Sequence, residues 1–266
     1  MTTAVNQTQA NPVDGTAVTP FEAARRRLGH WLRVDAARLL WPSRCLACEA
    51  PGLEGLDLCA ACAAALPWNR CACPACALPL PQPGTCGDCL RREAALVCHG
   101  RSAALSTVHA AFVYAAPLDR LLPRFKFHRD LASGALLSQL TAEAVASLPR
   151  PDAVIPVPLH QSRLRRRGYD QALELARPLA RSLDLHLRDD VLRRVRRTTP
   201  QSELNALSRR RNLKNAFAVE PGIPLPAHVV LIDDVMTTGA TLQAAADALK
   251  RAGVHRVDAW VCARVP

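Results

Sequence analysis

The stretch VVLIDDVMTTGAT, residues 229 to 241, places two adjacent acids between an apolar run and a loop of small residues. The apolar run reads as a buried strand that ends on Asp233 and Asp234. In an open parallel sheet, ligands bind beyond the carboxyl ends of the strands. The two carboxylates therefore predict a ligand site at the end of this strand.

The loop that follows the acids suits a phosphate group. Residues 236 to 241 lead directly into a helix, so backbone N–H groups and the positive end of the helix dipole face the loop. Its members are Thr237, Thr238, Gly239, Ala240 and Thr241, which supply three hydroxyls and a glycine that lets a ligand approach the backbone. A ribose 5-phosphate matches both halves, since its vicinal hydroxyls donate to the acids while the loop holds its phosphate. The competing interpretation is a plain junction between a strand and a helix.

The chain around this stretch alternates between strand and helix patterns from about residue 99 onward. Strand patterns occupy residues 106–114, 151–158, 229–234 and 255–265, and helix patterns occupy 116–127, 131–148, 168–183 and 239–253, the last ending at Gly253. Strand–helix repetition predicts an α/β fold, a mostly parallel sheet with helices on both faces.

Residues 44 to 98 form a different kind of block, which holds ten of the eleven cysteines. Eight of them make four Cys-x2-Cys pairs: Cys45 with Cys48, Cys59 with Cys62, Cys73 with Cys76, and Cys86 with Cys89. One pair brings two thiolates from a tight turn to one ion, and a second pair completes the tetrahedron that Zn²⁺ prefers. The spacing predicts two small structural zinc ribbons, with metal binding contributing on the order of 10 kcal/mol per ion to folding.

Other interpretations of the cysteines are a redox pair or inert buried thiols, which four regularly paired units disfavour. Cys71 and Cys98 are left over and are alternative ligands, while Cys262 in the last strand is expected in the core. Because each site is closed by four sulfurs, neither is expected to be catalytic.

Composition narrows the class of partner. The formal charge of +11 and the pI near 9.6 favour an anionic partner, such as nucleic acid, a phosphorylated small molecule or an acidic membrane. An arginine-rich coding bias is the alternative, since lysine occurs only at positions 126, 214 and 250. No apolar run approaches the roughly 18 residues that span a bilayer. With the thiol-rich block, this favours a cytoplasmic protein without a transmembrane segment.

The N-terminal region divides into two predicted parts. Residues 1–20 read as a disordered tail without a signal-peptide pattern, and residues 21–43 as a cationic amphipathic helix and linker. Docking on the protein itself is favoured for this helix over a membrane or nucleic acid. The zinc ribbons then occupy residues 44–98, and the α/β domain residues 99–266.

Several motifs in order resemble one family. The apolar strand, two acids and Thr/Gly loop resemble the site for phosphoribosyl pyrophosphate (PRPP) in type I phosphoribosyltransferases. The cysteine pairs, FKF at 125–127, PVPL at 156–159, RRGYDQ at 166–171, RRRNLKNAF at 209–217 and IDDVMTTGAT at 232–241 together resemble the ComF/GntX family over residues 41–266. Asp170 stands where asparagine is more usual in that family.

The resemblance implies a type I phosphoribosyltransferase-like sheet behind a double zinc ribbon, and a role in DNA uptake during natural competence or in DNA utilisation. It implies that PRPP binds with Mg²⁺, with Asp233 and Asp234 on the ribose hydroxyls, residues 237–241 on the 5-phosphate, and the loop at Pro158 on pyrophosphate. Candidate cations for the leaving pyrophosphate are Arg166, Arg167 and Lys126, the last by family position only.

The basic stretch at 193–215 has two competing interpretations. In the first, it is a mobile loop, long and polar enough to close over PRPP. In the second, its arginines neutralise DNA phosphates. The arginines are Arg193, Arg194, Arg196, Arg197, Arg209, Arg210 and Arg211. Base stacking would have to use Phe125, Phe127 or Tyr169, and core packing is favoured for the two phenylalanines. Three hypotheses follow: a PRPP-dependent phosphoribosyltransferase, a DNA-handling accessory that also contacts competence-machinery proteins, and a PRPP-sensing regulator.

Overall fold

The computed structural model describes residues 43–100, 102–196 and 215–266. Within them, Arg44–Pro266 forms one compact unit. The predicted tail and the predicted amphipathic helix lie outside the described residues. No helix in the described ranges is both long and apolar enough to cross a membrane.

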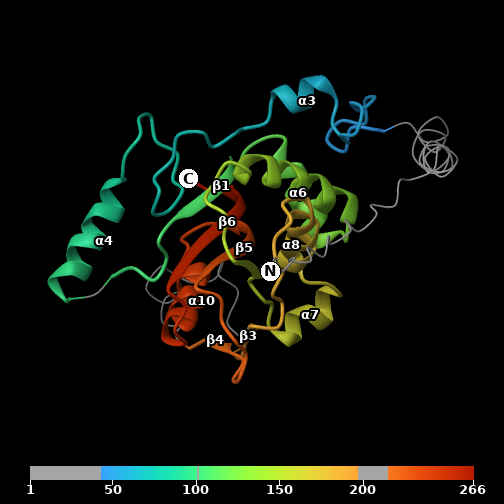
Figure 1. The fold of residues 1–266 in the computed structure, drawn as a ribbon. Coiled ribbons are helices and arrows are strands. Elements are labelled where there is room, and N and C mark those ends of the chain that lie inside the picture. The colour runs from blue at the N-terminus through green and yellow to red at the C-terminus, as the bar shows by residue number, and fades with distance from the viewer. Residues whose placement is uncertain (1–42, 101, 197–214) are drawn as a thin grey trace, which may run out of the picture. The chain divides into compact units, whose positions relative to one another are not determined.

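A four-stranded parallel sheet forms the centre of this unit (Figure 1). Its order is β1 (Val108–Val113), β6 (Arg256–Arg264), β5 (His228–Met236) and β2 (Ala153–Pro156), and every neighbouring pair is parallel. β5 and β6 read as nearly continuous apolar runs because helices cover both faces of a parallel sheet. The carboxyl ends of the four strands therefore share one edge.

Helices pack on both faces, as the alternating pattern predicts. Figure 1 shows α10 (Ala240–Arg251) on one side of the sheet, and α6 (Leu131–Val145) and α8 (Gln171–Ser182) on the other. Alternate residues of β5 separate two hydrophobic cores: Val229 and Leu231 join the core of α10, while Val230 and Ile232 join that of α6 and α8. α5 (Leu118–Phe127) completes the second core. The predicted fold class is confirmed.

Several elements were not predicted from the pattern. α7 (Gln161–Arg167) follows β2, and β3 (Leu192–Arg194) pairs antiparallel with β4 (Phe217–Val219); these two are called the hairpin strands. β4 packs against α10. The part of the basic stretch between the two hairpin strands, residues 197–214, lies outside the described residues, so the closing-loop and DNA interpretations of Arg197, Arg209, Arg210 and Arg211 stay predictions.

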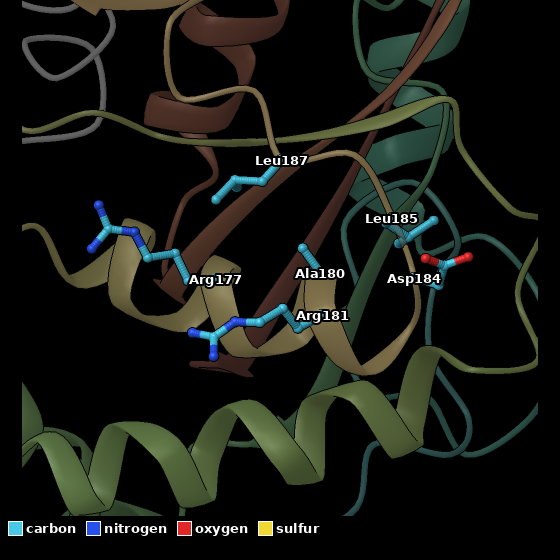
Figure 2. Close-up of a pocket in the computed structure, with 6 residues that line it drawn as sticks. All are labelled: Arg177, Ala180, Arg181, Asp184, Leu185 and Leu187. Atoms are coloured by element: carbon cyan, nitrogen blue, oxygen red, sulfur yellow. The ribbon is translucent and has the colours of Figure 1, made fainter. Parts of the chain in front are cut away.

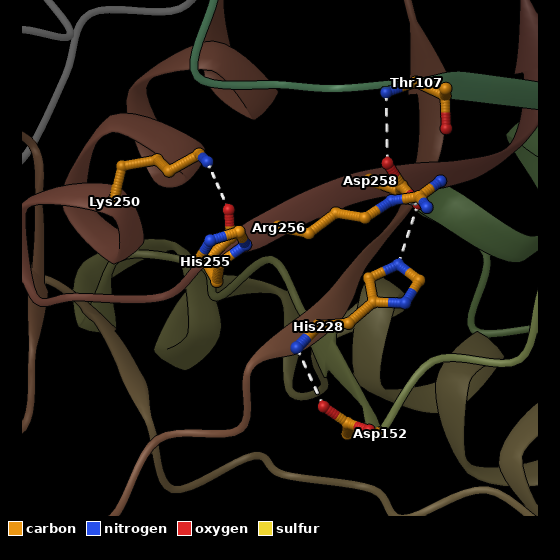
Figure 3. A network of polar contacts seen from close by, with 7 residues as sticks. All are labelled: Thr107, Asp152, His228, Lys250, His255, Arg256 and Asp258. Carbon is orange, nitrogen blue, oxygen red and sulfur yellow. Dashed lines mark hydrogen bonds and ion pairs between the residues drawn. The ribbon is translucent and has the colours of Figure 1, made fainter.

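A buried aspartate joins the amino ends of the strands (Figure 3). Asp258 in β6 is 4% exposed and accepts hydrogen bonds from the Thr107 backbone N–H at 3.1 Å and from His228 Nε2 at 2.8 Å. Arg256 lies 2.9 Å from the same carboxylate. Burial acts to raise the pKa of Asp258, but these donors and the Arg256 charge hold it below its ordinary value. The cluster lies at the edge opposite the predicted ligand site, so we assign it to stability.

Candidate functional site

The carboxyl edge of the sheet brings a lysine to the two predicted acids. Asp233 and Asp234 lie near the end of β5, and Lys126 reaches them from the last turn of α5. Lys126 Nζ lies 2.8 Å from Asp234 Oδ2, with 9% of the aspartate side chain and 28% of the lysine side chain exposed. The family resemblance alone had placed Lys126 here, and the structure brings it into direct contact.

The environment separates the two acids electrostatically. Burial and the adjacent Asp234 charge raise the pKa of Asp233 to about 8. Burial also acts to raise the pKa of Asp234, but the charge and hydrogen bond of Lys126 outweigh it and hold that pKa below its ordinary value. At neutral pH the edge therefore carries one ion pair, Lys126 with Asp234, beside a protonated Asp233.

Asp233→Asn is expected to stabilise the protein at alkaline pH. The folded-state pKa of Asp233 is raised from 3.8 to about 8, so its contribution to stability declines as pH rises from about 4 to about 8. Asparagine resembles the protonated acid and does not ionise. Thermal unfolding at about pH 5 and about pH 9 should show the variant's advantage in melting temperature growing with pH. Equal advantages at both pH values would contradict the assignment.

The predicted phosphate loop begins where β5 ends. Gly239 adopts a left-handed conformation with φ of +72° and is the N-cap of α10. The left-handed backbone favours glycine at this position, and a Cβ there would lie 2.4 Å from Met236 Cε, the end of a flexible side chain that would have to shift. Thr237 and Thr238 are exposed, and the Ala240 N–H donates to Thr238 Oγ1 at 3.5 Å. The loop thus presents hydroxyls and a helix N-terminus to solvent.

A second loop lies beside the end of β5. Pro158 follows β2, where the Val157 N–H donates to the Ile232 carbonyl at 2.9 Å. The Leu159 N–H donates to Asp170 Oδ2 at 2.8 Å, and the Leu173 N–H donates to Asp170 Oδ1. Asp170 therefore caps α8 and holds the proline loop with its two oxygens. An asparagine offers only one of these acceptors, which is the physical consequence of the departure from the family pattern.

The predicted arginines separate into different environments. Arg167 stacks over the Phe127 ring at 5.5 Å and donates to Gln171 Oε1 at 2.8 Å, whereas Arg166 is exposed. On β3, Arg193 pairs outward with Glu220 at 2.7 Å, while Arg194 lies over the Phe217 ring at 5.3 Å. Burial and the charge of Arg163 lower the pKa of Arg194 to about 10, and the charges of Asp233 and Asp170 act against them. Arg194 therefore lies near the acids, and the periodicity of the sequence did not predict that placement.

A shallow pocket elsewhere does not coincide with this edge. Its volume is about 340 Å³. Figure 2 shows the residues that line it, which are Arg177, Ala180, Arg181, Asp184, Leu185 and Leu187. These residues belong to the C-terminal half of α8 and the loop after it. Asp170, at the other end of α8, lies by the acids. The pocket and the candidate ligand site are therefore distinct.

The eight predicted metal ligands gather into two clusters. Cys45, Cys48, Cys59 and Cys62 form one, Cys73, Cys76, Cys86 and Cys89 the other, and within each the sulfurs lie within 4.8 Å of one another. Sulfur–sulfur distances of 3.6 Å in the first cluster and 3.7 Å in the second approach the edge of about 3.8 Å of a tetrahedron with Zn–S bonds of about 2.3 Å. The donor set therefore fits Zn²⁺. Cys71 and Cys98 belong to neither cluster, and Cys262 is buried as expected.

Each cluster is built by the same local structure. In both first pairs the backbone turns back on itself: the Glu49 N–H donates to the Cys45 carbonyl, and the Ala77 N–H to the Cys73 carbonyl. Glu49 and Ala77 share a left-handed conformation. The second pairs start helices, with Cys59 as N-cap of α3 (Ala60–Ala64) and Cys86 as N-cap of α4 (Gly87–Cys98). The repeat in spacing is thus a repeat in structure.

The comparisons with known proteins agree with this architecture. A family model for a double zinc ribbon domain matches residues 36–90, and one for a phosphoribosyl transferase domain matches residues 170–266. DNA utilization protein YhgH from Escherichia coli O157:H7 is 37% identical over 232 residues, which is 84% of this chain and 97% of that protein. The chain belongs to the ComF family.

Other relatives extend the same relationship. Competence protein F from Haemophilus influenzae is 38% identical over 190 residues, which cover 67% of this chain and 78% of the length of that protein. Competence protein ComFC from Streptococcus pneumoniae is 23% identical over 184 residues, 67% of this chain and 80% of its own. A solved orotate phosphoribosyltransferase from Aeropyrum pernix is 25% identical and covers 51% of this chain and 61% of its own, with a TM-score of 0.32 that is too low to support an argument.

Proposed function

We propose that this ComF family protein handles DNA in the cytoplasm during uptake or utilisation, and that its phosphoribosyltransferase-like domain binds PRPP with Mg²⁺. The relatives named for competence and for DNA utilisation support the cellular role. The observation that best supports this ligand is the Lys126–Asp234 ion pair near the end of β5, shortly before a helix N-terminus capped by glycine; its aspartate is buried and its lysine partly exposed. In this proposal Asp233 and Asp234 take the ribose hydroxyls and residues 237–241 take the 5-phosphate.

A buried donor next to Arg167 supports a ligand that offers an acceptor oxygen. Gln171 is 3% exposed, and its Oε1 accepts from Arg167. Within the described part of the chain its Nε2 has no hydrogen-bond partner. A buried donor without a partner costs about 1–3 kcal/mol, which a ligand oxygen would offset. Lys126 and Arg167 add positive charge at this place, since the Arg167 charge acts on Lys126.

The same residues define the chemistry that an active site would need. Mg²⁺ would neutralise charge on the pyrophosphate of the bound ligand. Lys126 and Arg167 would hold the departing pyrophosphate, and Asp234 would stabilise the positive charge that develops at the anomeric carbon by its own negative charge. A PRPP-dependent transferase and a PRPP-sensing regulator both use this pocket, and they differ only in whether an acceptor base is ribosylated.

Calorimetric titration of the zinc-loaded protein with PRPP and Mg²⁺ tests the pocket. We expect micromolar binding that is lost in the Asp233→Asn/Asp234→Asn variant, while DNA binding survives that change. Turnover with added nucleobases would favour the transferase, and a PRPP-dependent change in DNA affinity would favour the regulator. Absence of PRPP binding in the wild type would refute the pocket and leave the DNA role to be tested alone.

One exposed ring favours the DNA role. Both phenylalanines of FKF were predicted to pack in the core, and Phe125 does so, but Phe127 is 65% exposed. The prediction for Phe127 was wrong because it lies two residues after Phe125 on α5 and so faces away from the core. The Arg167 guanidinium covers one side of the ring. Arg129, whose Nε donates to the Arg167 carbonyl at 3.1 Å, adds a further positive charge.

Phe127→Ala is expected to weaken binding of a single-stranded oligonucleotide by about 1–3 kcal/mol, since one base loses its stacking surface. Because the ring is exposed, thermal stability should change little. Fluorescence anisotropy with a labelled oligothymidine at two salt concentrations measures the effect. Val97→Ala is the matched control, an apolar side chain that is 68% exposed on α4. Equal losses in the two variants would rule out a stacking platform.

A further inference from the structure

The second cysteine cluster is connected to the end of β5 by one arginine. Arg264, the last residue of β6, donates from Nε to the backbone carbonyl of Cys76 at 2.9 Å. Its Nη1 donates to the backbone carbonyl of Met236 at 3.5 Å. Cys76 is a predicted zinc ligand, and Met236 is the last residue before the phosphate loop. One guanidinium therefore holds both segments.

Met236 passes this connection to the loop by packing. Its side chain fills the space beside Gly239, where even a Cβ would meet Met236 Cε at 2.4 Å. Met236 is 5% exposed and lies in register with Arg264 across the β5–β6 pair. A methionine side chain is flexible, but the Met236 backbone also continues directly into the loop that ends at Gly239. A shift of the Met236 backbone would therefore move the N-cap of α10.

Only the second cluster shares a core with the loop. Cys73, Cys76, Cys86 and Cys89 pack in the same hydrophobic core as Met236 and Leu242, the latter in the first turn of α10. Cys45 instead belongs to the core of α5, α6 and α8 on the other face of the sheet. The first cluster has its own arginine, since Arg124 Nη1 donates to the Leu46 carbonyl at 2.7 Å. The two ribbons therefore support different faces of the domain.

We infer that Arg264 is a positioning residue that makes the shape of the ribose-phosphate loop depend on the metal-bound second cluster, and not on the first. The functional half of this inference rests on the proposed PRPP pocket. Because coupling between two sites is reciprocal, a ligand held by the loop must also strengthen retention of zinc in the second cluster. Arg264 would then link metal binding and phosphate binding without touching either group.

The mechanical half is tested on zinc-loaded protein without any ligand. Arg264→Met removes both hydrogen bonds at similar side-chain length, Arg264→Lys restores a single donor, and Arg124→Met is the matched control on the first ribbon. Hydrogen exchange of the amides at 241–244 is expected to be at least about fivefold faster in Arg264→Met, partly restored in Arg264→Lys and unchanged in Arg124→Met. Two zinc ions per chain must remain in each variant, and equal exchange in all four proteins would overturn the inference.

The ligand half uses PRPP with Mg²⁺ and a chromogenic zinc chelator. Zinc release is expected in two phases, the faster one from the first cluster, where Cys48 is exposed. PRPP should slow only the later phase, by at least about fivefold in wild type and not in Arg264→Met. A ligand effect of the same size in both proteins would overturn the coupling. Absence of PRPP binding to wild type would instead refute the proposed pocket, and the exchange result would still decide whether Arg264 holds the loop.

Discussion

Serine in place of Cys89 is expected to unfold the parallel-sheet domain, whereas serine in place of Cys62 should destabilise it less. The two cysteines hold the same place in their ribbons, each the last ligand and each in the first turn of a helix. Their surroundings differ, because all four cysteines of the second cluster are buried in the core of α10, whereas in the first cluster only Cys45 is buried and Cys48 is exposed.

The size of the destabilisation expected for Cys89→Ser follows from comparing two free energies. A structural zinc contributes on the order of 10 kcal/mol, and a domain is stable by only about 5–15 kcal/mol. Loss of the second zinc would also disconnect the support of β1, because the Val108 N–H donates to the Pro74 carbonyl at 2.8 Å inside that ribbon. Far-ultraviolet circular dichroism during heating, together with zinc content per chain, measures both variants. Equal falls in melting temperature would contradict the assignment of the second cluster to the sheet's core.

Residue spacing predicted the fold because each element carries its own pattern. The apolar run of β5, the helical pattern of α10 and the four cysteine pairs are local signals that tertiary packing reinforces. The pattern missed α7, which buries none of its residues, and the short strands of the hairpin, which are too brief to show a period. It also gave no sign of the left-handed backbone at Glu49 and Ala77, where glycine would be the usual signal.

The candidate site was predicted in its acidic and loop residues but not in its electrostatics. Two adjacent aspartates look alike in a sequence, and only Lys126, about a hundred residues earlier in the chain, decides which of them keeps its charge. Arg193 and Arg194 are likewise neighbours in the sequence, but their side chains lie in different environments because alternate residues of a strand face opposite sides. Contacts between distant segments therefore set the chemistry of residues that local pattern can only locate.

Asp234→Asn is expected to lower the affinity for PRPP by at least about a hundredfold, near the upper range for loss of a charge-assisted hydrogen bond, and to destabilise the fold as well. Removing one member of a fully buried ion pair costs about 3–5 kcal/mol because the other charge loses its partner, and here the cost should be smaller because 28% of the Lys126 side chain is exposed. The two effects can be separated with Lys126→Met and the double variant Asp234→Asn/Lys126→Met. Urea denaturation should show that the double variant regains stability relative to Asp234→Asn, since no buried charge is left unpaired.

Calorimetry on the same four proteins decides the role of the carboxylate. If Asp234 binds the ribose hydroxyls, the double variant regains stability but not PRPP affinity, because the acceptor is still missing. If the pair serves the fold alone, affinity should return together with stability. Because Lys126 is itself proposed to hold the pyrophosphate, the comparison is with Lys126→Met, and a further loss of affinity in the stable double variant would assign Asp234 to the ligand. Recovery of affinity would show that other groups at this edge of the sheet bind the ribose hydroxyls, and Asp233 would be the first residue to test.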